Sequence, residues 1–131
     1  MTVHQTAEIF AALWLAVLGL SHLARPRQWI EIFARLRDAG DAGVFAVAIL
    51  HLVPGTLIAA THNVWTWPAV VLTIVGWGWI TKASLYFLFP AAGRWGLSTV
   101  RPGREAGFRC AGIVLLAIAG LLAWNLMSAR S

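Results

Sequence analysis

Four apolar stretches, each close to twenty residues long, constrain this chain more than any other feature of its sequence. The hydrocarbon core of a bilayer is about 30 Å thick, and a helix needs about 20 mostly apolar residues to cross it. The stretches predict membrane-spanning helices at about residues 7–24, 42–61, 67–89 and 106–127. Composition agrees, because 60% of the 131 residues are hydrophobic and only 11% are charged, against about 25% charged in soluble domains. We therefore expect an all-α integral membrane bundle of four transmembrane helices, forming a single domain over residues 1–131.

The two longer connections between these spans differ in character. Residues 27–38 predict a short amphipathic helix, because Pro26 suits the first position of a helix and apolar residues then recur at helical spacing. These residues are Trp29, Ile32, Phe33 and Leu36. Such a helix lies in the membrane interface, where its arginines meet anionic lipid headgroups. The connection at 91–107 contains several glycines and a proline, and we expect it to be irregular.

The arginines predict the orientation of the chain. Eight of them lie in these two connections: Arg25, Arg27, Arg35, Arg37, Arg94, Arg101, Arg104 and Arg109. Positive residues stay on the cytoplasmic side of a membrane. We therefore expect a multi-pass protein of the cell membrane, with both connections cytoplasmic and both termini outside. The formal net charge of +5 is then a topology signal, and no nucleic-acid partner is expected.

Aligning the sequence with itself at a shift of 64 residues reveals a weak internal repeat. It aligns Pro26 with Pro90 and Gly43 with Gly107, so that each proline follows a span and each glycine opens the next one. The weak repeat indicates either a parallel duplication of two halves or a chance recurrence of proline and glycine at the ends of membrane helices.

Lys82 is the most costly residue to place in hydrocarbon. It stands seven positions before Phe89, about 10 Å of helix inside the end of the third span. A charge at a helix centre costs about 2.5–3.5 kcal/mol on insertion scales. Either its stem snorkels toward the headgroups, or it marks a site of function or assembly. Trp79 and Tyr86 share its helical face and can offer aromatic rings to the cation.

His51 lies near the middle of the second span, at a depth similar to that of Lys82. Pro54, on the same face, removes a backbone hydrogen bond and frees the carbonyl of Leu50. An imidazole, a freed carbonyl and a lysine at one level are what a site inside a helix bundle needs. The alternative is a core histidine that donates to a backbone carbonyl.

Glu8 and His22 lie near opposite ends of the first span, on one stripe of the helix. We expect each side chain to hydrate its polar group at its own interface. The alternative is a polar ladder across the membrane, with Glu8 outside, His51 and Lys82 midway and His22 inside, as in proton relays.

Motifs of catalysis are missing from the sequence. There is no phosphate-binding glycine loop, no His-Glu-x-x-His and no serine nucleophile elbow. Cys110, as the single cysteine, excludes an internal disulfide and a thiolate cluster, and His22 and His51 differ too much in depth to share a haem. We therefore expect no catalytic residue, no metal and no cofactor, and we lean against an enzyme.

The segment from His62 to Pro90 resembles a class of small four-span bacterial membrane proteins. It carries H-N-x-W, T-x-x-G-W, a lysine and a span-ending proline, at His62, Asn63, Trp65, Thr73, Gly76, Trp77, Lys82 and Pro90. The resemblance implies the four-helix layout and a bacterial inner membrane, and it supports Lys82 and the loop from His62 to Trp65 as site residues. It implies no activity. Ala83 departs from the class, which has glycine after the lysine.

Together these features favour a small polytopic membrane protein that acts as a transport or channel unit through a midplane polar cluster. We expect a homo-oligomer, because four short helices enclose little pore by themselves. The alternative is a structural or accessory subunit whose polar groups pair with the helices of a partner protein, since no acidic residue is expected near Lys82.

Overall fold

Six helices make up the described part of the chain, residues 1–129 of a computed structural model. The four long helices are α1 (Val3–Ala24), α3 (Asp41–Thr61), α4 (Val70–Leu88) and α6 (Glu105–Ser128), and each is long and apolar enough to cross a membrane. The two short helices are α2 (Pro26–Asp38) and α5 (Pro90–Ser98). The expected all-α class, the four spans and the short helix between the first two spans are confirmed.

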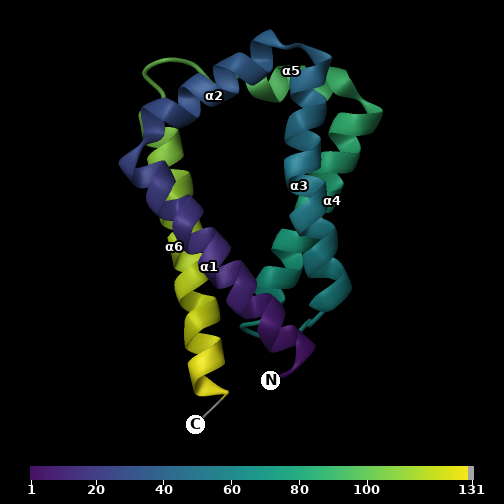
Figure 1. The fold of residues 1–131 in the computed structure, drawn as a ribbon, viewed down its shortest axis with the longest axis vertical. Coiled ribbons are helices and arrows are strands. Elements are labelled where there is room, and N and C mark those ends of the chain that lie inside the picture. The colour runs from purple at the N-terminus through teal and green to yellow at the C-terminus, as the bar shows by residue number, and fades with distance from the viewer. Residues whose placement is uncertain (130–131) are drawn as a thin grey trace.

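The long helices form two pairs, with α1 packed along α6 and α3 packed along α4. The pairs approach each other where both chain termini lie, and they diverge toward the other end, where α2 crosses from one pair to the other (Figure 1). We call the end that carries α2 and α5 the arginine end, because eight arginines lie in or beside these helices. The opposite end is called the terminal end.

Glycine allows the close approach of the two helices within each pair. A Cβ atom on Gly112 of α6 would lie 2.7 Å from the carbonyl oxygen of Gly19 on α1, which is inside van der Waals contact. In the other pair, a Cβ atom on Gly76 of α4 would lie 2.6 Å from a methyl group of Ile58 on α3. Any larger residue at these positions would push the helices apart, and small residues at such crossings are typical of membrane helix pairs.

The arrangement is the one that two parallel repeats produce. The first span of each half packs against the second span of the other half, since α1 packs on α6 and α4 packs on α3. The 64-residue shift maps the crossing glycines onto small residues of the other pair. Gly19 and Gly112 correspond to Ala83 and Ala48, and Gly55 and Gly76 correspond to Ala119 and Ala12. Ala48 and Ala83 are fully buried, so the same close packing recurs in both pairs.

Ion pairs at the arginine end repeat the same relationship. Asp41 and Glu105 correspond under the shift and are the first residues of α3 and α6. Asp41 pairs with Arg94 of α5, and Glu105 lies 3.8 Å from Arg27 of α2. Each short helix thus bonds the start of a long helix that belongs to the other half.

Proline sets the start of both short helices. Pro26 and Pro90 occupy the first turn of α2 and α5, where the missing N–H costs nothing. The expectation of an irregular connection at 91–107 was wrong for its first part, because Pro90–Ser98 is helical. Leu97 of α5 is buried against Val44 of α3, and this tertiary contact outweighs the low helix propensity of the glycines.

The fold contains two apolar cores, one between the helix pairs and one between α3 and the short helices. The core toward the terminal end unites residues of all four long helices, namely Ala11, Leu15, Ile58, Leu72, Ala119 and Leu122. The core at the arginine end contains Val44, Val47 and Leu97, with Phe33 and Leu36 of α2 packed on it. Helix α2 buries Ile30 and leaves Ile32 exposed, which differs from the apolar face read from the sequence.

Candidate functional site

Lys82 and His51 form a direct contact between α4 and α3. The ammonium nitrogen of Lys82 lies 3.1 Å from Nε2 of His51, and Nδ1 of His51 lies 2.8 Å from the carbonyl oxygen of Val47. Because lysine is only a donor and a carbonyl oxygen only an acceptor, His51 donates from Nδ1 and accepts at Nε2. The pattern assigns a neutral imidazole that positions the ammonium. His51 therefore donates to a backbone carbonyl, as the alternative interpretation expected, and it also contacts Lys82; a site at these two residues stays a prediction.

Aromatic rings flank this contact, as the spacing on α4 predicts. The ring of Trp79 meets that of His51 edge to face, with centroids 6.0 Å apart. The ammonium of Lys82 lies 5.6 Å from the centroid of Tyr86, within cation–π range. Trp79 also packs on the core that contains Leu15 of α1, so this face of the α3–α4 pair is turned toward the α1–α6 pair.

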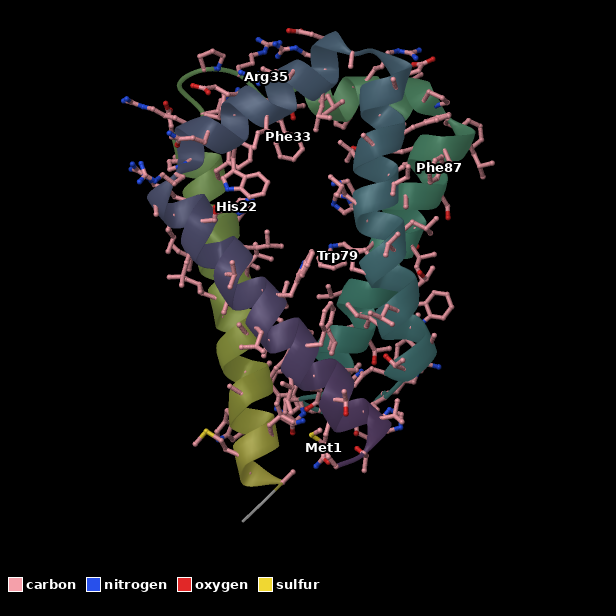
Figure 2. All side chains as sticks on the ribbon, viewed as in Figure 1. Met1, His22, Phe33, Arg35, Trp79 and Phe87 are labelled. Carbon is pink, nitrogen blue, oxygen red and sulfur yellow. The ribbon has the colours of Figure 1, made fainter. Side chains whose placement is uncertain are left out.

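Three labelled side chains show what borders the space between the pairs. His22 from α1 and Phe33 from α2 point into it near the arginine end, and Trp79 enters it from α4 (Figure 2). Nδ1 of His22 lies 2.7 Å from the carbonyl oxygen of Leu18, and its ring stacks on Trp29 at 4.2 Å. His22 is therefore a half-buried aromatic contact that anchors α2 on α1.

No carboxylate in the described residues neutralises Lys82. Four of the five acidic residues lie at the arginine end, in or beside the short helices: Glu31, Asp38, Asp41 and Glu105. The fifth, Glu8, has other partners near the terminal end. The titratable groups in contact with Lys82 are therefore the imidazole of His51 and the phenol of Tyr86.

Glu8 corrects an expectation from the sequence. Its side chain is only 5% exposed, whereas we expected a hydrated group at the interface. Its Oε1 atom lies 3.0 Å from Nε2 of His62, and the amide of Asn125 donates to both carboxylate oxygens at 3.1 and 3.0 Å. Burial is tolerable because three hydrogen bonds satisfy the carboxylate.

His62 connects this cluster to α4. It follows the last residue of α3, and its side chain is fully buried. Its Nδ1 atom lies 3.3 Å from the hydroxyl of Thr73, which donates to the carbonyl of Val64 at 2.7 Å and accepts from the Val64 N–H at 3.0 Å. The Thr73 hydroxyl thus links the ring of His62 to the backbone of Val64.

We call Glu8, His62, Thr73 and Asn125 the terminal clamp. Glu8 and Asn125 belong to the α1–α6 pair, whereas His62 and Thr73 belong to the α3–α4 pair. The clamp is thus a polar connection between the two pairs. Sequence reasoning missed Asn125 altogether, although a polar amide inside an apolar span is by itself a signal of a polar partner.

The alternative interpretation, a polar ladder across the membrane, does not form a continuous chain of hydrogen bonds in the described residues. His22, the Lys82–His51 contact and Glu8 each have their own partners, and no hydrogen bond joins the three levels within residues 1–129. Pro54 is buried inside a continuous α3 but takes no part in the Lys82 contact.

The loop residues of the His62–Trp65 segment divide into one buried and two exposed members. His62 is buried in the clamp, while Asn63 and Trp65 are exposed. The indole N–H of Trp77 donates to the side chain of Asn63 at 3.2 Å. Of the residues in these sequence motifs, His62 and Thr73 therefore take part in the hydrogen-bonded cluster with Glu8.

No family model, no curated protein and no solved structure matches this chain. The class of the protein therefore rests on its four candidate membrane spans, which imply contact with a lipid bilayer. The resemblance of the His62–Pro90 segment to small bacterial membrane proteins stays a prediction.

Proposed function

We propose that this protein is a membrane transport unit for a small anion, which binds between the two helix pairs at Lys82. The observation that carries the proposal is the environment of the Lys82 ammonium. A neutral imidazole holds it, aromatic rings flank it, and no carboxylate of the described residues pairs with it. A half-buried cation within a membrane span is stabilised by a nearby counter-charge, and a transported anion would supply that charge.

The basic groups along the proposed path support an anion over a cation. His22 points toward the region between the pairs (Figure 2), Lys82 contacts His51 across the α3–α4 pair, and eight arginines lie in or beside the short helices at the arginine end. Such an electropositive entrance raises the local concentration of anions. The acidic residue nearest the opposite end, Glu8, is occupied by the terminal clamp.

The two pairs are the natural moving parts of such a unit. Each pair is held together internally by close crossings at Gly19 with Gly112 and at Gly55 with Gly76. Between the pairs, the terminal clamp and the apolar core around Leu15 close one end. Transport by rocking of one bundle against another would open this end by separating Glu8 from His62.

The test is anion flux into liposomes that contain the purified protein. Vesicles carry an anion-sensitive dye and face gradients of chloride, nitrate, acetate or lactate. We expect at least one anion to cross faster than in empty vesicles, and we expect Lys82→Met to abolish the difference. Thr81→Val is the matched control, because Thr81 is exposed on the same helix and bonds only the carbonyl of Trp77.

Two results would contradict the proposal. If no anion crosses faster than in empty vesicles, the protein is not an anion transport unit under its own power. If a pH-sensitive dye reports proton flux that depends on Lys82 without any anion gradient, the unit conducts protons instead.

The accessory-subunit alternative was motivated by the absence of an acidic partner for Lys82. His51 gives Lys82 a hydrogen-bond partner within the chain but no counter-charge, so a carboxylate of a partner helix would supply the same charge as a transported anion. This alternative and the expected homo-oligomer remain predictions, which affinity purification in mild detergent would test through the stoichiometry of the recovered species.

A further inference from the structure

A pocket of about 520 Å³ opens at the corner where α1 ends, α2 begins and α6 starts. Its charged lining consists of Arg25, Arg27, Arg109 and Glu105. The volume lies within the range of roughly 300–1,000 Å³ that is usual for small-molecule sites. This corner is separate from Lys82 and from the terminal clamp.

The pocket carries more positive charge than the fold neutralises. Arg27 lies 3.8 Å from the carboxylate of Glu105, whereas Arg25 and Arg109 make no ion pair or side-chain hydrogen bond within residues 1–129. Three guanidinium groups therefore face one carboxylate, and two positive charges remain uncompensated. An anion with two negative charges, or one that contacts two guanidinium groups at once, matches this excess.

The other half of the chain acts as an internal control for these arginines. Under the 64-residue shift, Arg25 corresponds to Phe89 and Arg109 corresponds to Phe45. Glu105 corresponds to Asp41, and each pairs with an arginine of the short helix of the other half, although Arg27 and Arg94 do not themselves correspond. The same corner is thus built without the two unpaired arginines, so helix packing alone does not require them.

The start of α2 adds backbone donors to the pocket. Arg25 precedes the helix and provides no side-chain cap, and Pro26 has no N–H. The N–H groups of Arg27 and Gln28, in the first turn, lack partners within the helix, and both residues line the pocket. Guanidinium groups beside such donors are suited to phosphate oxygens, which arginine binds in a bidentate manner.

We infer that this corner binds a phosphate group, held chiefly by Arg25 and Arg109. Two sources share this chemistry: the headgroup of an anionic phospholipid and a soluble phosphate. The pocket lies at the ends of two candidate spans, α1 and α6, which is the level of lipid headgroups. The inference does not depend on transport, because it concerns binding at a different site.

The experiment measures binding to the whole protein in nanodiscs. One arm compares discs of phosphatidylcholine with discs that also contain phosphatidylglycerol, and native mass spectrometry counts the lipids that stay bound. The second arm titrates inorganic phosphate onto the protein in phosphatidylcholine discs. Binding in the first arm identifies a lipid source, and binding in the second identifies a soluble one.

Matched variants distinguish a specific phosphate site from nonspecific electrostatic attraction of anions to the basic surface. The pair Arg25→Gln with Arg109→Gln should weaken binding about tenfold or more, since charge-assisted contacts are lost. The control pair, Arg35→Gln with Arg101→Gln, removes the same charge at the same end from residues that do not line the pocket, and it should change affinity less than about twofold. Glu105→Gln should tighten binding, because it removes the only carboxylate of the pocket.

Equal weakening in the pocket and control pairs would overturn the inference, because it would show diffuse attraction to an anionic surface. Absence of binding in both arms would overturn it as well. Circular dichroism of each variant tests whether the helices are intact. The tighter binding expected for Glu105→Gln is a gain of affinity, which a misfolded variant would not show.

Discussion

Oε1 of Glu8 lies 3.0 Å from Nε2 of His62, and this bond joins the first span of one helix pair to the end of a span in the other. Both side chains are buried, and Asn125 completes the coordination of the carboxylate. The terminal clamp is therefore the polar counterpart of the apolar core that holds the pairs together nearby. Its strength should appear both in the stability of the fold and in the ease with which the pairs separate.

Removal of His62 should destabilise the protein strongly. His62→Ala leaves Glu8 buried with Asn125 as its remaining partner, and breaking a buried pair from one side costs about 3–5 kcal/mol. Unfolding in mixed micelles with a rising fraction of denaturing detergent measures the change. Thr81→Val is the control, because Thr81 is exposed and its hydroxyl bonds only the carbonyl of Trp77 on its own helix. Equal effects of the two variants on the free energy of unfolding would mean that the terminal clamp does not stabilise the fold.

The hydroxyl of Thr73 should matter more than its methyl group. Thr73→Val removes the hydrogen-bond partner of the His62 ring and the acceptor for the Val64 N–H, which should cost about 1–3 kcal/mol. Thr73→Ser keeps these bonds and should lie much closer to the wild type. Thr56→Val serves as the control, since the exposed Thr56 bonds only its own helix. A Ser variant as unstable as the Val variant would contradict the assigned role.

The crossing of α1 and α6 should not tolerate a side chain. Gly112→Ala places a Cβ atom 2.7 Å from a backbone carbonyl of Gly19, and such overpacking should cost about 1–3 kcal/mol. Gly120→Ala, on the same helix, meets no atom within 4 Å and should be neutral or stabilising by up to about 1 kcal/mol. Thermal unfolding of the two variants in one detergent decides the question. A Gly112 variant as stable as the Gly120 variant would show that the helices are not in close contact.

Lys82 is the only lysine of the chain, so amine chemistry reports on it directly. An amine-reactive reagent should modify Lys82 more slowly when a transported anion is present, because the anion occupies the ammonium. Peptide mass spectrometry measures the rate, with the amino terminus as the internal reference. His51→Leu should remove the hydrogen-bond partner of the ammonium and speed its modification. If no anion protects Lys82 in the wild-type protein, the binding step of the proposed transport is contradicted.

The orientation predicted from the arginines can be tested with single cysteines on a Cys110→Ser background. Asn63→Cys should react with a membrane-impermeant maleimide on intact cells, whereas Asp38→Cys should react only after permeabilisation. Both native residues are exposed, and neither change removes an arginine. Labelling of Asp38→Cys alone on intact cells would reverse the predicted topology.

The sequence determined the features that depend on local pattern. Apolar length identified the four spans, helical spacing and Pro26 identified α2, and depth along the helices placed His51 and Lys82 at one level. These features follow from the thickness of a bilayer and the geometry of a helix, which require no knowledge of neighbours.

Only the tertiary structure decided which helices pair and which polar groups meet. Glu8 and His62 are 54 residues apart, and Asn125 lies 117 residues beyond Glu8, so no local pattern links them. Helix α5 is a further example, because its glycines predict a loop while burial of Leu97 on Val44 stabilises a helix. The physical reason is the same in each case: contacts between distant segments supply hydrogen bonds and apolar burial that outweigh the preferences of the segments themselves.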